Sequence, residues 1–91
     1  MGLKYSVEFT ETADIDLKKW KKSGNKIIQN KITTLLNDIS EHPDFGLGKP
    51  EQLVENLSGY WSRRIDSQHR IVYRILAEEK KVIIHSLYGH Y

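Results

Sequence analysis

Residues 48–73 read GKPEQLVENLSGYWSRRIDSQHRIVY, and the rest of the chain is organised around this stretch. The Leu-Ser-Gly sequence at 57–59 is a turn signal, and residues 60–65 after it are predicted to form a strand. Residues 66–68 make a hairpin loop of ordinary length. A second strand is predicted over 69–76, where apolar residues alternate with more polar ones. The stretch therefore predicts a β-hairpin whose strands carry several arginines.

Residues 4–9, near the start of the chain, alternate between apolar and polar side chains, which predicts a strand with one buried face. Thr10 suits the start of a helix, because its hydroxyl can accept a hydrogen bond from an unpaired backbone N–H. Apolar residues recur at helical spacing through 11–22. The Ser-Gly-Asn sequence at 23–25 is typical of one helix ending and another beginning.

Apolar residues at helical spacing predict a second helix after this break. They are Ile28, Ile32, Leu35, Leu36 and Ile39. The helix is expected to end at His42, because the residue before a proline is pushed out of the helical region. Two helices joined by a short turn form a helical hairpin, and its apolar face needs a sheet to cover.

The remaining segments complete a single domain over residues 1–91. A loop is expected at 44–50, a helical turn at 51–53, a β-turn at 78–80 and a last strand at 82–88. The predicted fold class is α+β with the order β-α-α-β-β-β. Its sheet is small and antiparallel, with the helical hairpin on one face and the other face partly open.

Composition narrows the classes of protein that fit this chain. The 91 residues include no cysteine, which excludes disulfides and thiolate metal sites and fits a reducing compartment. No long apolar run indicates a signal peptide or a membrane span, so a cytoplasmic location is expected. The histidines lack metal-ligand spacing, and no metal or cofactor site is predicted. The net charge of +2 is too small for general coating of duplex nucleic acid.

Arginines within the predicted hairpin strands need an explanation. They are Arg63, Arg64, Arg70 and Arg74. One interpretation is a solvated sheet face whose charges resist aggregation. The other is a phosphate cradle, since guanidinium donors match phosphate oxygens and nearby aromatic rings can stack unpaired bases. The pattern alone leaves both open, and it leaves the role of Trp61 open as well.

The motifs GKPEQL, NLSGYWSRRI and HRIVYRI, together with the final HY, resemble in combination the YoeB branch of the RelE toxin superfamily. The resemblance covers nearly the whole chain, including FTETADIDL at the first helix. It implies the RelE-like microbial RNase fold in a toxin of a type II toxin-antitoxin system. Such toxins cut mRNA in the ribosomal decoding site, and a YefM-like antitoxin encoded beside each toxin neutralises it.

The resemblance assigns roles to particular residues. The general base falls on Glu51, the transition-state arginine on Arg70 and the general acid on His90. The resemblance also implies RNA contacts from Arg64 and Tyr91, and the arginine and aromatic pattern adds Arg63 and Trp61 as expected RNA contacts. The sequence departs from many relatives at Val54, where they carry a basic residue, so a phosphate contact is expected to be missing here.

These residue types suit RNA cleavage without a metal. The 2′-hydroxyl of RNA is the nucleophile, a carboxylate accepts its proton, and histidine protonates the leaving 5′-oxygen. Arginine stabilises the charge that develops on the phosphate. The expected products are a 2′,3′-cyclic phosphate and a 5′-hydroxyl. The ribosome is expected to hold the mRNA in line for attack.

A different function on the same scaffold is a ParE-like toxin that binds DNA gyrase and cleaves nothing, because a fold does not determine a function. A third role is co-repression of its own operon in complex with the antitoxin. The antitoxin would then supply the contacts to operator DNA. The sequence leaves the oligomeric state open, a homodimer included, and no membrane partner is expected.

Overall fold

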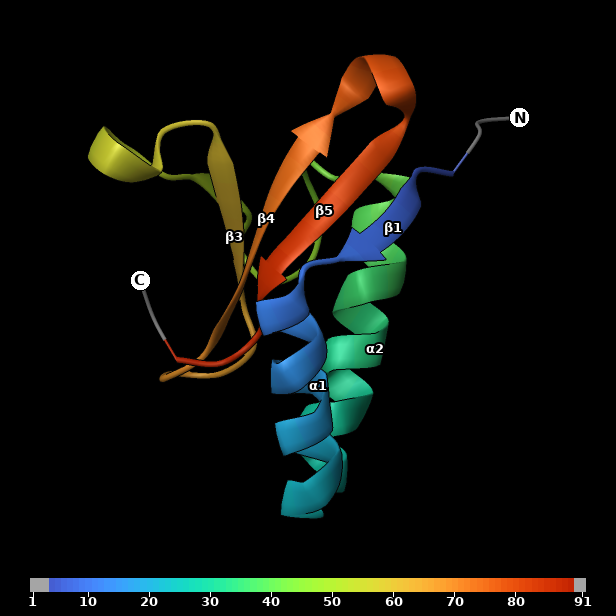
Figure 1. The fold of residues 1–91 in the computed structure, drawn as a ribbon, viewed down its shortest axis with the longest axis vertical. Helices are drawn as coiled ribbons and strands as arrows, with labels where there is room; N and C mark the ends of the chain where they lie inside the picture. The colour runs from blue at the N-terminus through green and yellow to red at the C-terminus, as the bar shows by residue number, and fades with distance from the viewer. Residues whose placement is uncertain (1–3, 90–91) are drawn as a thin grey trace.

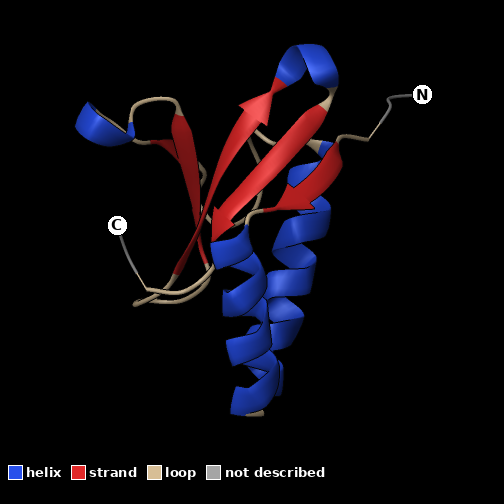
Figure 2. Ribbon diagram, viewed as in Figure 1, coloured by secondary structure: helices blue, strands red, loops and turns tan. Residues whose placement is uncertain are grey.

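The computed structural model describes residues 4–89 and places two helices against a five-stranded sheet with the strand order β1-β5-β4-β3-β2 (Figures 1 and 2). The elements are β1 (Ser6–Phe9), α1 (Glu11–Ser23), α2 (Lys26–Glu41), β2 (Glu51–Gln52), β3 (Tyr60–Arg64), β4 (Arg70–Leu76) and β5 (Lys81–Ser86). Short 3-10 turns follow β2 and β4. The predicted α+β fold and its element order are confirmed.

Capping residues fix the helical hairpin as expected. Thr10 accepts a hydrogen bond from the N–H of Ala13 at 3.1 Å, and Gly24 ends α1 in the left-handed region at φ 72°. Asn25 then caps α2 by accepting from the N–H of Ile28 at 3.1 Å. The helix ends at Glu41, ahead of the proline. Local signals alone therefore predicted both helices.

One face of the sheet is closed by the helices. The core joins Ile32, Leu35 and Ile39 of α2 to Ile71, Tyr73 and Ile84 of the strands. Each is at most 3% exposed, and burying such an apolar side chain contributes about 1.5–3 kcal/mol relative to leaving it in water. Arg74, on the other side of β4, is exposed. The opposite face of the sheet is therefore the open one.

Two expectations about the strands are corrected. The sheet is mixed, because β1 runs parallel to β5, with Val7 opposite Val82. Alternation of side chains predicts a strand but carries no information about its direction. The helical turn expected at 51–53 is wrong: Glu51 and Gln52 form β2 at the sheet edge, antiparallel to β3. The helical turn lies instead at Glu55–Leu57.

Strand ends also differ slightly from prediction. The last strand ends at Ser86, two residues early, and β4 begins at Arg70. None of the helices formed within residues 4–89 has the length and apolar character needed to cross a membrane.

Candidate active site

The open face of the sheet brings Glu51 and Arg70 together. Arg70 Nη1 lies 3.2 Å from Glu51 Oε1 and 3.3 Å from Ser62 Oγ. β2 supplies Glu51 opposite Ser62, and β4 begins with Arg70 opposite Arg64. A carboxylate and a guanidinium separated by 19 positions in the chain thus share one site. The Glu51 side chain is 54% exposed, which leaves it accessible to a substrate.

Ser62 is a member of this site that the sequence analysis missed. Its side chain is fully buried, and its hydroxyl accepts a hydrogen bond from Arg70. The bond helps to hold the guanidinium in one orientation. Alternation along β3 provides the signal that could have found it, because Ser62 lies two residues before Arg64 and so on the same face.

Arg64 lies on the open face as expected. It is exposed and directly opposite Arg70 in the β3–β4 register. Further along the same face, the ring of Tyr60 lies 5.3 Å from the His85 ring and 5.8 Å from the guanidinium of Arg74. Aromatic and cationic side chains of this kind can stack on unpaired bases. The cationic and aromatic groups of the open face thus continue beyond Arg64.

The predicted RNA contact through Arg63 is wrong. Its side chain is fully buried on the helix side of the sheet, opposite Ile71. The guanidinium has five N–H donors, and five acceptors take them. They are the Tyr73 hydroxyl, the Asp38 carboxylate and the carbonyls of His42, Phe45 and Leu47. Arg63 therefore ties the loop after α2 to the sheet and cannot reach a substrate.

Electrostatics around Arg63 agree with a structural role. Burial raises the pKa of Asp38, but hydrogen bonds from Arg63 and from the backbone of Leu47, with the charge of Arg63, outweigh it and leave the pKa below its usual value. Burial raises the pKa of Tyr73. Its hydroxyl keeps its proton and donates to the Pro43 carbonyl at 2.6 Å.

Trp61 lies on the same side of the sheet as Arg63, opposite Tyr73. It is partly buried and packs against the hydrophobic core. The structure thus places it on the face opposite to that of Glu51 and Arg70. The hairpin register predicts the face on which Trp61 lies, because a residue paired directly opposite a core side chain lies on the same face of the sheet.

His90 and Tyr91, the predicted acid and its neighbour, lie outside the described residues. The last described residue, Gly89, is hydrogen-bonded to the first residue of β4 and to the residue before it. Its carbonyl accepts a hydrogen bond from the N–H of Arg70 at 3.1 Å. Its own N–H donates to His69 Nδ1 at 2.8 Å. The chain is thereby fixed next to Arg70 immediately before the predicted acid.

Helix α1 holds the preceding residues of this tail. The carbonyl of Leu87 accepts a hydrogen bond from Trp20 Nε1 at 2.7 Å, and its N–H donates to the buried carboxylate of Asp16 at 2.9 Å. The rings of Trp20, His69 and Tyr88 contact one another with centroids about 5 Å apart, from 4.7 to 5.1 Å. Helix α1 and His69, which are distant in sequence, thus position residues 87–89.

Within the part of the chain that the structure describes, no group of three or more His, Cys, Asp or Glu side chains is arranged to hold a metal ion.

Comparison with known proteins identifies close relatives. A family model described as YoeB-like toxin of bacterial type II toxin-antitoxin system matches residues 9–91. A Toxin YoeB from Synechocystis is 42% identical over 85 residues, 93% of this chain and 95% of the relative. A Toxin YoeB from Streptomyces coelicolor is also 42% identical, over 93% of this chain and 98% of the relative.

Solved structures agree with this match. The YoeB/ParE toxin from Agrobacterium tumefaciens superposes with a TM-score of 0.88 at 32% identity, covering 94% of this chain and 99% of that one. YoeB in a YoeB-YefM complex from Staphylococcus aureus gives 0.82 at 37% identity over the whole of both chains. A YoeB dimer from the same organism gives 0.83 at 36% identity, covering 97% and 99%.

Proposed function

This chain belongs to the YoeB-like toxins of bacterial type II toxin-antitoxin systems, and on that premise we propose that it is a ribosome-dependent endoribonuclease that cuts mRNA in the A-site. The observation that carries the proposal is the contact between Arg70 and Glu51 on the open face of the sheet. A ParE-like toxin that acts by binding needs no such pairing of a base with a phosphate-binding cation. The proposed location is the cytoplasm, where ribosomes translate.

Each proposed chemical step uses one side chain. The 2′-oxygen attacks the adjacent phosphorus while Glu51 takes the hydroxyl proton. Arg70 stabilises the charge on the non-bridging phosphate oxygens. The bond from phosphorus to the 5′-oxygen breaks, and His90 gives that oxygen a proton. The message is left with a 2′,3′-cyclic phosphate on one fragment and a 5′-hydroxyl on the other.

Glu51→Gln is expected to lower the rate of mRNA cleavage by roughly 10²–10⁴, because the amide cannot accept the proton. Primer extension on a translated message, with and without ribosomes, measures this. Glu78→Gln is the matched control, since it makes the same change at an exposed carboxylate in the Ala77–Glu79 turn, away from the pair. Fragments ending in 3′-hydroxyl and 5′-phosphate, or equal loss in both variants, would contradict the proposed chemistry.

The proposed partner is a YefM-like antitoxin. Relatives from Staphylococcus aureus have been crystallised with YefM and as a YoeB dimer. We expect the product of an adjacent small gene to bind this chain with more than about 1,200 Å² of buried surface. Co-expression should restore growth and give a complex that co-purifies. Failure of both would argue against the antitoxin assignment.

Regulation by the complex and self-association belong to the same proposal. With a net charge of +2, the chain is poorly suited to bind duplex DNA by itself. In a co-repressor complex the antitoxin would therefore contact the operator. A homodimer of the toxin is proposed by analogy with the dimeric relative.

A further inference from the structure

Two hydrogen bonds hold Gly89, at the end of the tail formed by residues 87–89, against the start of β4. The N–H of Gly89 donates to His69 Nδ1 at 2.8 Å, and its carbonyl accepts from the N–H of Arg70 at 3.1 Å. Gly89 has φ 77°, a conformation that glycine adopts readily because it has no Cβ. The carbonyl carbon of Gly89 is bonded to the nitrogen of His90, so the two hydrogen bonds fix the point from which the proposed acid extends.

The bond from Gly89 determines the protonation state of the His69 ring. A backbone N–H can only donate, so Nδ1 accepts and carries no hydrogen, and the hydrogen of the neutral ring is on Nε2. A proton on Nδ1 would place two N–H groups against each other and break the bond. Turning the ring over would present Cδ2, which is no acceptor. The bond therefore exists only while His69 is neutral.

The ring of His69 is held by contacts on several sides. It meets the Trp20 ring edge-on with centroids 4.9 Å apart, and it lies 4.7 Å from the Tyr88 ring. The backbone N–H of His69 donates to Asp66 Oδ1 at 2.7 Å. Helix α1, the tail and the hairpin loop thus all hold this residue in place. Gly89 is the partner that a proton on Nδ1 would displace.

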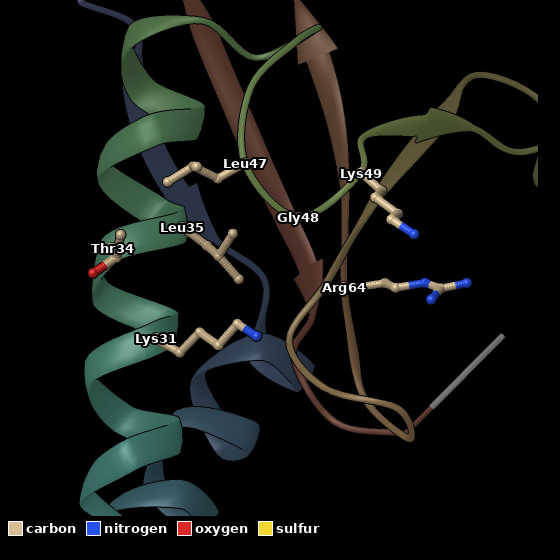
Figure 3. A pocket seen from close by; sticks show the side chains of 7 residues that line it. All are labelled: Lys31, Thr34, Leu35, Leu47, Gly48, Lys49 and Arg64. Atoms are coloured by element: carbon tan, nitrogen blue, oxygen red, sulfur yellow. The ribbon is translucent and has the colours of Figure 1, made fainter.

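Charged and titratable groups surround this contact. They are Asp66 in the hairpin loop, Asp16 and Lys19 on α1, Lys31 on α2, Tyr88 in the tail and Arg70 on β4. Figure 3 shows Lys31 extending from α2 toward the hairpin loop. Burial raises the pKa of Asp66, but hydrogen bonds from the backbone of Gln68 and His69 outweigh it and leave the pKa below its usual value. Histidine is the side-chain type that changes charge between about pH 5 and 8, so His69 is the variable charge at this place.

We propose that His69 is a positioning residue for the proposed RNA cleavage: its neutral ring holds Gly89 beside Arg70, and protonation of the ring releases the end of the chain. Cleavage then needs a neutral His69 and a protonated His90 at the same time. Its rate therefore passes through a maximum between the pH values at which the two histidines titrate. The part played in cleavage rests on the proposed function, whereas release of the tail is measured without RNA.

Amide exchange followed by NMR tests the release in the intact chain, with no RNA or ribosome present. Protonation of His69 is read from its own ring signals between about pH 5 and 8. As the ring takes up its proton, protection of the Gly89 amide, corrected for the intrinsic exchange rate at each pH, is expected to fall about five- to tenfold, the factor for one hydrogen bond. The N–H of Leu87, which donates to Asp16, is the internal control and should keep its protection. Constant protection of Gly89, or an equal fall at both amides, would overturn the proposal.

Two substitutions at position 69 separate the acceptor from the ring. His69→Asn keeps an acceptor, because its Oδ1 can take the place of Nδ1, but it does not titrate, so Gly89 should stay protected across the pH range. His69→Phe keeps a ring against Trp20 and Tyr88 but accepts no hydrogen bond, so Gly89 should be unprotected at every pH. Equal protection of Gly89 in the two variants would contradict the proposed role of Nδ1.

Cleavage of a translated message in single-turnover conditions, over the same pH range, tests the role of His69 in the reaction. The wild-type rate should fall as His69 is protonated, and this fall should be absent in His69→Asn. His69→Phe should be slower by roughly 10- to 100-fold at every pH, because misplacing a reacting group by about 1 Å can cost about 100-fold. A loss of stability alone would lower the rate without changing its dependence on pH.

The two measurements distinguish the tail contact from the chemistry. Release of Gly89 on protonation of His69, in a chain that cleaves no message, would support the contact and reject the proposed cleavage. Cleavage by both variants with the wild-type rate and pH profile would leave the proposed cleavage in place and overturn the positioning role of His69.

Discussion

Replacing Arg63 with methionine is expected to lower the free energy of unfolding by about 3–5 kcal/mol. The substitution keeps an apolar stem in the core but removes every donor of the guanidinium. The carboxylate of Asp38, whose side chain is only 13% exposed, would lose its cationic partner at 2.5 Å. Three loop carbonyls would lose a donor as well. Urea denaturation followed by circular dichroism measures the change.

The adjacent arginine provides the control. Arg64→Met removes the same group from an exposed position, so its stability is expected to stay within about 0.5 kcal/mol of wild type. Adding Asp38→Asn to Arg63→Met should cost less than the sum of the single changes, because both remove the same ion pair. Equal destabilisation by Arg63→Met and Arg64→Met would refute the structural role of Arg63.

Arg63→Met should also change how stability depends on pH. The folded-state pKa of Asp38 is lowered, so its contribution to stability is present above the unfolded-state pKa of about 3.9 and is lost as the pH falls through the folded value. Without Arg63, the main interaction that lowers the pKa of Asp38 is lost. The loss of stability below about pH 4 is therefore expected to be smaller in Arg63→Met than in wild type.

The buried arginine also shows where sequence reasoning reached its limit. The sequence shows four arginines in two adjacent strands as a single positively charged cluster, but side chains alternate along a strand, so the arginines lie on two different faces of the sheet. The core residue Ile71 lies opposite Arg63, whereas Arg64 lies opposite Arg70. Telling them apart requires the hairpin register, and a shift of one residue would exchange the faces. Charge type alone could not make this distinction.

Local and non-local features were predictable to different extents. The helices were predicted well because Thr10, Gly24 and Asn25 act through hydrogen bonds and backbone angles within a few residues. β2 was missed because two residues have no periodicity, and Glu51 becomes a strand residue only by pairing with Ser62. The parallel pairing of β1 with β5 likewise depends on the whole topology.

The pairing of Glu51 with Arg70 was recognised from the family resemblance together with the geometry of the sheet. Resemblance to a family supplied the residue types and their proposed roles, and the sheet brings the two side chains within 3.2 Å. Ser62 shows what such a resemblance leaves out, since its hydroxyl orients Arg70 from a fully buried position. Residues that support a reacting group are recognised from geometry, since their chemistry alone does not mark them.

Deleting His90 and Tyr91 is expected to reduce mRNA cleavage by roughly 10²–10⁴, the usual contribution of a general acid. Stability should change little, because the hydrogen bonds that fix the tail act on Leu87 and Gly89, which the deletion leaves in place. Cleavage of a translated message in single-turnover conditions measures the first effect. Thermal unfolding and antitoxin binding measure the second.

A point substitution separates the acid from its neighbour in the same assay. His90→Gln keeps a side chain of similar size that forms hydrogen bonds but cannot transfer a proton at neutral pH, so it should behave like the deletion. Tyr91→Phe keeps the aromatic ring and should retain most of the activity. Cleavage at close to the wild-type rate by the shortened chain would show that His90 is not the acid. Unfolding of the shortened chain, with His90→Gln folded and fully active, would instead give these last residues a structural role.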